Sequence, residues 1–212
     1  LTQGVGDELK REGYFGRLQQ HFSQYNGIEA VDLTNTAKRG RRSDQLLKML
    51  KAGDIDHHIR KAHLITLTIG GNDIMKVIKK DLFNLTVEAF EKELNKFEKN
   101  YEQILDEIRE INSTAPIIIM GLYNPITIVT DEKSEFDLIL NNWNEAIEEM
   151  AEDDMNACFT PIDHLFVTNT NLVYHTDFFH PNSKGYQLVI DEIVSSMQDC
   201  GLIDEDNREL LF

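Results

Sequence analysis

The sequence has 212 residues, a hydrophobic content of 41% and a formal net charge of −16. The length and the apolar content suit one globular domain with a core of its own. The negative charge argues against a nucleic-acid partner, because affinity for a phosphate backbone comes mainly from lysine and arginine, and against general attraction to anionic membranes. No stretch approaches the roughly 18 apolar residues of a membrane span, so we expect no integral membrane segment in this chain.

The first part of the chain alternates amphipathic segments with short apolar runs. Residues 14–25 and 43–50 have the pattern of helices. Residues 28–33 and 64–69 have the pattern of strands, and the second of these runs is rich in β-branched side chains.

A long amphipathic helix is predicted next. Its apolar residues recur at alternating spacings of three and four, which places them on one face. They are Val87, Phe90, Leu94, Phe97, Tyr101, Ile104, Ile108 and Ile111. Beyond it, residues 117–122 and 158–162 have the pattern of strands, and residues 136–150 and 186–197 have the pattern of helices.

Strands that alternate with helices are typical of parallel pairing through right-handed crossovers. Parallel strands are covered on both faces, so they read as continuous apolar runs, as residues 64–69 and 117–122 do. We therefore predict an α/β fold, a three-layer α/β/α sandwich around a parallel sheet. No linker or repeat divides the sequence, so residues 1–212 are expected to form a single domain. Ligands of such sheets bind beyond the carboxyl ends of the strands, where catalytic residues should be sought.

The two cysteines, Cys158 and Cys200, lie far apart and have no CxxC spacing. They therefore predict neither a zinc site nor a redox motif, and we interpret them as two unpaired, partly buried thiols. The sequence predicts no metal site.

The residues most suited to acid–base chemistry are Asp177 and His180, just before the last helix. A histidine can act as a general base because its ordinary pKa lies near neutrality. It needs an acidic partner that fixes its tautomer and stabilises the imidazolium. A spacing of three residues on a tight turn lets the two side chains meet, and Pro181 disfavours a helical conformation at His180. The alternative is a loop aspartate and a loop histidine that never touch.

Glycine-containing loops follow two of the predicted strands. Gly70 and Gly71 would let a ligand approach the backbone closely. The Asn72 amide can donate to a developing oxyanion, while Asp73 is better placed to hold the loop than to react. Gly40 could turn its N–H towards a bound oxygen. Each loop could equally be a plain turn, because glycine, asparagine and aspartate favour turns in any case.

Four pieces of the sequence, in this order, resemble the conserved blocks of the SGNH hydrolases, also called GDSL lipases or acylhydrolases. They are Leu1-Thr2-Gln3-Gly4, Gly40, Gly70-Gly71-Asn72-Asp73 and Asp177-Phe178-Phe179-His180-Pro181. The resemblance runs nearly end to end and implies a bacterial serine hydrolase with a flavodoxin-like, five-stranded parallel sheet. It implies that His180 is the general base and Asp177 its orienting acid. It also implies that the Gly40 N–H and the Asn72 side chain are two of three oxyanion donors, and that no cofactor is needed.

The resemblance further implies that the nucleophilic serine stands immediately before Leu1, at the end of the first strand of the sheet. None of the serines within the sequence lies in a Gly-x-Ser-x-Gly elbow. Losing a central strand would leave its neighbours with unpaired backbone groups, each costing about 1–3 kcal/mol. We therefore expect the folded protein to carry that strand upstream of Leu1, so the domain printed here is incomplete at its N-terminus.

The expected activity is that of a serine esterase or lipase, which hydrolyses a small-molecule or lipid carboxylic ester through an acyl-enzyme. One alternative is a carbohydrate O-acetylesterase on the same scaffold. Another is a non-catalytic binding module that retains the fold. The resemblance to exported or lipid-anchored bacterial relatives suggests an extracytoplasmic or cell-surface location.

Two sequence features bear on the substrate. Four basic residues around Gly40 could attract an anionic substrate, although we prefer to interpret them as a solvated loop that pairs with nearby acids. They are Lys38, Arg39, Arg41 and Arg42. Residues 126–129, together with Phe178 and Phe179, could line an acyl pocket or belong to the core.

Overall fold

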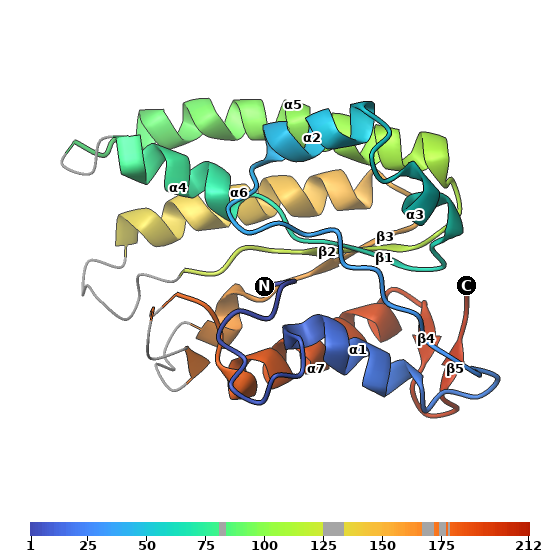
Figure 1. Ribbon diagram of the computed structural model, residues 1–212. Coiled ribbons are helices and arrows are strands. Elements are labelled where there is room, and N and C mark those ends of the chain that lie inside the picture. Colours follow the sequence, from blue (N-terminus) through green and yellow to red (C-terminus); the bar gives the residue numbers. More distant parts are fainter. Residues whose placement is uncertain (81–83, 125–133, 167–171, 174–176, 178) are drawn as a thin grey trace. The chain divides into compact units, whose positions relative to one another are not determined.

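The computed structural model describes residues 1–80, 84–124, 134–166, 172–173, 177 and 179–212 (Figure 1). Their contacts divide the chain into two compact units. The terminal unit holds the described residues among 1–37, 123–131 and 160–212, and the central unit holds those among 38–122 and 132–159. That residues 1–212 form a single domain therefore stays a prediction.

A parallel pair of strands lies in the central unit. β1 (Ile65–Leu67) pairs with β2 (Ile117–Met120), with Ile65 opposite Ile117 and Leu67 opposite Ile119. All four residues of β2 are buried, as its unbroken apolar run requires. The sheet has the order β1-β2-β3, where β3 is Ala157–Thr160. The predicted α/β class with a parallel sheet is therefore confirmed.

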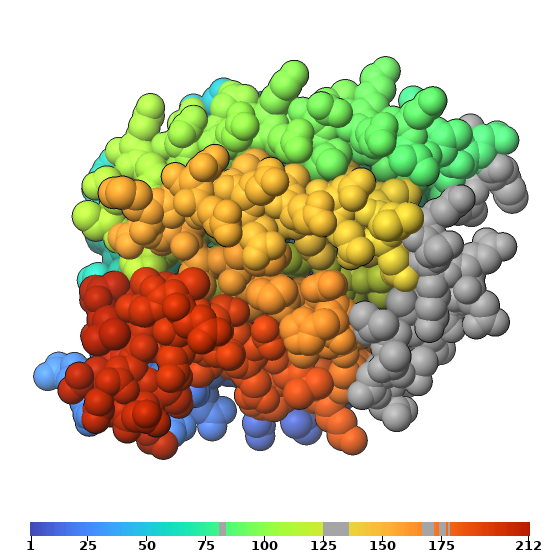
Figure 2. Space-filling model, turned by 180° about the vertical axis from the view of Figure 1, so that it is seen from behind, coloured from blue at the N-terminus to red at the C-terminus, as the bar shows by residue number. Residues whose placement is uncertain are grey.

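Five helices belong to the central unit: α2 (Ser43–Lys51), α3 (Asp56–Lys61), α4 (Gly71–Lys80), α5 (Val87–Ile111) and α6 (Ser134–Glu152). The longest, α5, packs against the other four. Figure 2 shows α6 beside α5 on one face of this unit. Most of the predicted apolar stripe lies on the buried face of α5, where Phe97, Tyr101 and Ile104 are at most 1% exposed, whereas Val87 at its start is 46% exposed. Thr86 caps this helix by accepting a bond from the Ala89 N–H.

The terminal unit is built from both ends of the chain. α1 (Gly13–Phe22) packs against α7 (Ser183–Asp199), which also contacts the short 3-10 helix η2 (Asp163–Phe166) and the strand β4. β4 (Ile203–Asp204) and β5 (Glu209–Leu210) form an antiparallel pair. The core of this unit contains the fully buried side chains Tyr14, Ile162, Tyr186, Val189 and Ile193.

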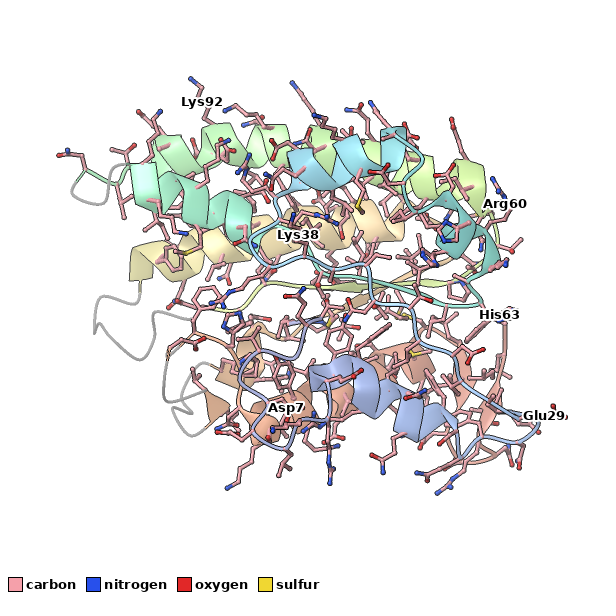
Figure 3. The ribbon with its side chains drawn as sticks, viewed as in Figure 1. Asp7, Glu29, Lys38, Arg60, His63 and Lys92 are labelled. Carbon is pink, nitrogen blue, oxygen red and sulfur yellow. The ribbon has the colours of Figure 1, made fainter. Side chains whose placement is uncertain are left out.

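A buried ion pair stands at the start of the terminal unit. The Asp7 carboxylate receives both terminal nitrogens of Arg17, at 2.5 and 3.0 Å, and the side chains are only 1% and 4% exposed. Asp7 lies next to the first turn of α1 (Figure 3) and also accepts the Gly13 N–H at 3.0 Å. Burial works to raise the pKa of Asp7, but the bonds from Arg17, Ser183 and Gly13 outweigh it. The net effect lowers this pKa from 3.8 to about 2.

This ion pair predicts a loss of stability in acid. Because the folded pKa of Asp7 is depressed, its contribution is fully present above pH 3.8 and is lost as the pH falls towards 2. The contribution should be about 2 kcal/mol. Urea unfolding of the wild-type protein and Asp7→Asn should show this difference at pH 6 and a much smaller one near pH 2. An equal difference at both pH values would contradict the prediction.

The structure differs from the sequence-based expectations in several places. The strand predicted at residues 28–33 is wrong, since this stretch is irregular and bonds locally. The Ile28 N–H donates to the Tyr25 carbonyl at 3.3 Å, and the Val31 carbonyl accepts from the Gln19 side chain at 2.6 Å. It forms no ladder with any described strand. The larger of the two described sheets has three strands, so the five-stranded parallel sheet with its first strand before Leu1 stays a prediction.

The cysteine interpretation is also wrong. Neither Cys158 nor Cys200 is a free thiol, because both are disulfide-bonded. Sequence spacing alone does not reveal whether a cysteine forms a disulfide. No described helix is both long and apolar enough to cross a membrane.

Candidate active site

Asp177 and His180 meet on a turn of the terminal unit. The His180 Nδ1 atom lies 2.7 Å from an Asp177 carboxylate oxygen, and the side chains are 14% and 28% exposed. The other carboxylate oxygen accepts the backbone N–H groups of Phe179 and His180, both at 3.0 Å. With Nδ1–H donating to the carboxylate, the basic lone pair of the imidazole lies on Nε2. This arrangement is suited to a histidine that accepts a proton.

The electrostatics of the turn keep Asp177 ionised. Burial works to raise its pKa, but the N–H groups of His180 and Phe179 and the His180 imidazole outweigh burial, so the pKa lies below 3.8. An ionised carboxylate at Nδ1 stabilises an imidazolium. The pair can therefore take up a proton at His180 without leaving an uncompensated charge.

Elements on both sides hold this turn. The Tyr123 hydroxyl donates to the Phe179 carbonyl at 2.6 Å, and its ring packs against that of Phe166 at a tilt of 34°, with centroids 4.4 Å apart. Pro181 forms a β-bridge with Val173. No role is assigned to Tyr123 from the sequence. Tyr123 follows Gly121 by two residues at the carboxyl end of an apolar strand, and residues in such positions often contribute to a site.

The start of α7 fixes the downstream side of the turn. The Asn182 side chain caps this helix by accepting the N–H groups of Lys184 and Gly185, both at 3.0 Å. A Cβ on Gly185 would lie 2.4 Å from the Leu172 carbonyl oxygen, so only glycine lets the helix approach this closely. The helix therefore begins three residues after His180 in a defined place.

In the central unit, the structure brings the Asn72 side chain to the Gly40 loop. Gly40 has φ +78°, in a turn closed by the Arg41 N–H and the Lys38 carbonyl at 3.1 Å. The Asn72 amide donates to the Arg41 carbonyl at 3.1 Å. A Cβ on Gly40 would meet nothing within 4 Å, so the backbone conformation, rather than crowding, favours glycine here.

A buried polar chain holds the exit of this loop. Asp73 accepts the Ser43 hydroxyl at 2.6 Å and the Ser43 N–H at 3.0 Å, and Asn100 donates to the same hydroxyl at 3.0 Å. Ser43 is fully buried and is the first residue of α2, so Asp73 fixes where that helix starts. Burial raises the pKa of Asp73, and the bonds from Ser43 partly oppose this shift. Asp73, predicted to hold the loop that contains it, lies in α4 and holds the start of α2 instead.

Gly70 and Gly71, the two adjacent glycines before Asn72, should respond differently to replacement by alanine. Gly70 has φ +118°, and an added Cβ would lie 3.1 Å from the Phe97 ring and 3.3 Å from Leu122. Gly70→Ala should therefore cost about 1–3 kcal/mol. Gly71 begins α4 and has open space at its Cβ, so Gly71→Ala should be neutral or stabilise by up to about 1 kcal/mol. Urea unfolding of both variants checks this, and equal effects would contradict it.

The basic loop is at least partly paired. Arg42 forms two bonds to Asp44, at 2.9 and 3.0 Å, and Arg41 reaches the Met49 sulfur at 3.0 Å. For Arg42, this pairing agrees with the interpretation of the basic residues as a solvated loop that pairs with nearby acids. Residues 126–129 and Phe178, considered above for an acyl pocket, lie outside the described residues. Within the described part of the chain, no three His, Cys, Asp or Glu residues are placed to hold a metal ion.

The chain is similar to two Bacillus proteins along most of its length. The chain is 35% identical over 207 residues to YpmR of Bacillus subtilis (strain 168), across 97% of this chain and 81% of that protein. It is 27% identical over 209 residues to the spore germination lipase LipC of Bacillus licheniformis, across 91% of this chain and 90% of that protein.

Solved structures show the same fold. The lipase Lip_vut3 from a goat rumen metagenome matches with a TM-score of 0.76 and 24% identity, over 92% of both chains. The acetylxylan esterase Axe2 of Geobacillus stearothermophilus matches with a TM-score of 0.66 and 15% identity, over 89% of this chain and 81% of Axe2. The sequence pattern of the GDSL-like Lipase/Acylhydrolase family matches residues 1–188. The chain therefore belongs to the GDSL-like lipase/acylhydrolase family.

Proposed function

We propose that this protein is a serine esterase that hydrolyses carboxylic acyl esters through an acyl-enzyme. The observation that carries the proposal is the 2.7 Å contact between Asp177 and His180 Nδ1. It supports His180 as general base and Asp177 as its orienting acid. Family membership supports a hydrolase in general terms. In this proposal the nucleophile is a serine immediately before Leu1, where the first conserved block would place it.

The chemistry proceeds in two halves. The serine oxygen attacks the ester carbonyl while His180 Nε2 takes its proton, and the resulting imidazolium then protonates the leaving alcohol. Water enters next, gives a proton to His180 and attacks the acyl-enzyme. The acid is released as the proton returns to the serine. No cofactor takes part.

The proposed oxyanion donors are the Gly40 N–H, the Asn72 amide and the N–H of the serine. An asparagine amide carries two N–H groups. One of those of Asn72 donates to the Arg41 carbonyl at 3.1 Å, which fixes the orientation of the amide. The other can then donate to the oxyanion without reorganisation, which is the condition for strong transition-state stabilisation.

A carbohydrate O-acetylesterase is the second candidate. The fold likeness to an acetylxylan esterase favours considering it, whereas one of the relatives is named a lipase. The two differ in the acyl chain that they accept. Rates on p-nitrophenyl esters from acetate to palmitate distinguish them: an O-acetylesterase should reject every ester longer than a few carbons, and a lipase should not.

A fluorophosphonate probe tests the proposed mechanism on the full-length protein, including the residues upstream of Leu1. We expect an adduct on the serine that precedes Leu1, located by peptide mass spectrometry, and we expect His180→Ala to lose it. A folded protein that gives no adduct would refute the proposal and favour a binding module that retains the fold.

We also propose an extracytoplasmic or cell-surface location. Both cysteines are disulfide-bonded, and disulfides persist mainly in oxidising compartments. Fractionation of the source cells, with the thiols alkylated before lysis, should find the protein outside the cytoplasm with neither cysteine alkylated. A cytoplasmic protein with two alkylated cysteines would contradict the proposal.

A further inference from the structure

We propose that the buried pair Asp7–Arg17, together with Ser183, is a positioning element that sets the nucleophilic serine relative to His180. The inference deepens the proposed function and rests on it, since it takes the serine to precede Leu1. Asp7 and Arg17 belong to the segment that follows this serine. Ser183 begins the helix that follows His180. All the contacts in the argument lie within the terminal unit.

The first observation is that the N-terminal segment is fastened to α7. The buried Tyr186 of α7 donates its hydroxyl to the Val5 carbonyl at 2.8 Å and lies 3.3 Å from the Leu1 carbonyl oxygen. Gly4 has φ +65°, and a Cβ there would lie 2.6 Å from the Gly13 nitrogen. The segment is therefore too closely packed to move independently of α1 and α7.

The second observation is the number of bonds that converge on Asp7. Its carboxylate accepts from the backbone N–H groups of Arg11 and Gly13, from two nitrogens of Arg17 and from the Ser183 hydroxyl at 2.7 Å. Arg17 in turn donates to the Ser183 carbonyl at 3.3 Å. One small, rigid anion thus joins the N-terminal segment, α1 and the first residue of α7.

Ser183 makes further bonds to the same segment. Its hydroxyl accepts the Leu9 N–H at 3.0 Å, and its own N–H donates to the Glu8 carboxylate at 3.1 Å. The start of α7 is therefore held through backbone and side chain together. Since Asn182 and Pro181 connect Ser183 directly to His180, a shift of Ser183 would move the imidazole as well.

Stability alone does not explain this arrangement. Buried ion pairs can often be replaced by apolar residues without loss of stability, because desolvation offsets the attraction between the charges. What the pair supplies in addition is geometry, since the five directional bonds to Asp7 fix the N-terminal segment, α1 and the first residue of α7 relative to one another. A displacement of about 1 Å between reacting groups can lower a rate about 100-fold, so this geometry matters for catalysis.

The test compares full-length variants by their kcat and KM on a p-nitrophenyl ester, their fluorophosphonate labelling rate and their thermal midpoint. Asp7→Asn and Ser183→Ala should lower kcat and labelling about 10- to 100-fold with KM changed by less than about 3-fold. Ser183→Thr, which keeps the hydroxyl, should restore most of the loss. Assays run well below the thermal midpoint of each variant separate geometry from unfolding.

A second Arg–Asp pair provides the matched control. Arg109 and Asp154, in the central unit, form the same two-pronged pair at 2.7 and 2.8 Å, with side chains 19% and 12% exposed. Asp154→Asn should lower the thermal midpoint without changing kcat. If Asp7→Asn fails to fold, the kcat of Ser183→Ala tests the inference by itself.

The outcomes separate this inference from the proposed function. An active wild-type protein with unimpaired kcat in folded Ser183→Ala and Asp7→Asn would overturn the inference alone. So would a Ser183→Thr variant as impaired as Ser183→Ala. A wild-type protein that neither hydrolyses esters nor accepts the probe would overturn the proposed function, and this inference with it.

Discussion

Replacing His180 with alanine is expected to lower kcat/KM for ester hydrolysis about 10,000-fold or more. The variant loses the proposed base that activates the nucleophile and the acid that protonates the leaving group. The turn itself should survive, because Asp177 keeps its bonds from two backbone N–H groups, and the side chain removed is already partly exposed. Steady-state kinetics and circular dichroism of the variant measure the two effects separately.

The matched control for this variant is His164→Ala. His164 also lies in the terminal unit and contacts a carboxylate, with 3.4 Å between its Nε2 atom and Glu192, but its side chain is 53% exposed. It should keep kcat/KM within about 2-fold of the wild type, as expected for an exposed ion pair with little effect on the fold. A His180→Ala variant with activity close to that of His164→Ala would remove His180 from the mechanism.

Replacing Asn72 with alanine should lower kcat about 100- to 1,000-fold, the usual effect of losing one oxyanion donor. The ground state of the ester carries little charge on its carbonyl oxygen, so KM should change much less. The fold should tolerate the change, since Asn72 is only partly buried and its one bond described here joins the Arg41 carbonyl. A stopped assay on a p-nitrophenyl ester measures both constants.

Asn95→Ala controls for the loss of an asparagine side chain. Asn95 is exposed on α5, and its amide donates to the Glu91 carbonyl at 2.7 Å, so it also makes one side-chain bond to a backbone oxygen. Its kcat should equal that of the wild type. If both variants retained full activity, a different donor would have to stabilise the oxyanion.

Elements whose pattern reflects their own packing could be predicted from sequence. The apolar stripe of α5 gave its limits correctly, from Val87 to Ile111. α4 was missed because Gly70 and Gly71 suggested a loop, although Ile74 and Ile78 have helical spacing and are buried. The strand expected at residues 28–33 failed for a different reason. A strand depends on a neighbour for its hydrogen bonds, and a local pattern does not contain that information.

In the candidate site too, contacts between residues close in sequence could be predicted, and contacts between distant residues could not. Asp177 and His180 are three residues apart, so a turn alone could bring them together, and their contact could be anticipated. The bond between Ser183 and Asp7 joins residues 176 positions apart and leaves no local signal. Tyr123 lies 56 positions from Phe179, whose carbonyl it holds. Residues that support a site from distant parts of the chain are therefore the ones that a single sequence conceals.

The terminal unit is assembled from the two ends of the chain, which has a consequence for synthesis on the ribosome. Residues 1–37 are made before the central unit, but α7, against which α1 packs, is made after it. Until then the apolar face of α1, with Tyr14, Leu18 and Phe22, lacks its native contact with α7. The central unit is nearly continuous in sequence and can close early. While the central unit is being made, the nascent chain therefore exposes apolar surface of α1 that α7 later covers. Exposed apolar surface of this kind makes a nascent chain prone to aggregation, which chaperones counteract.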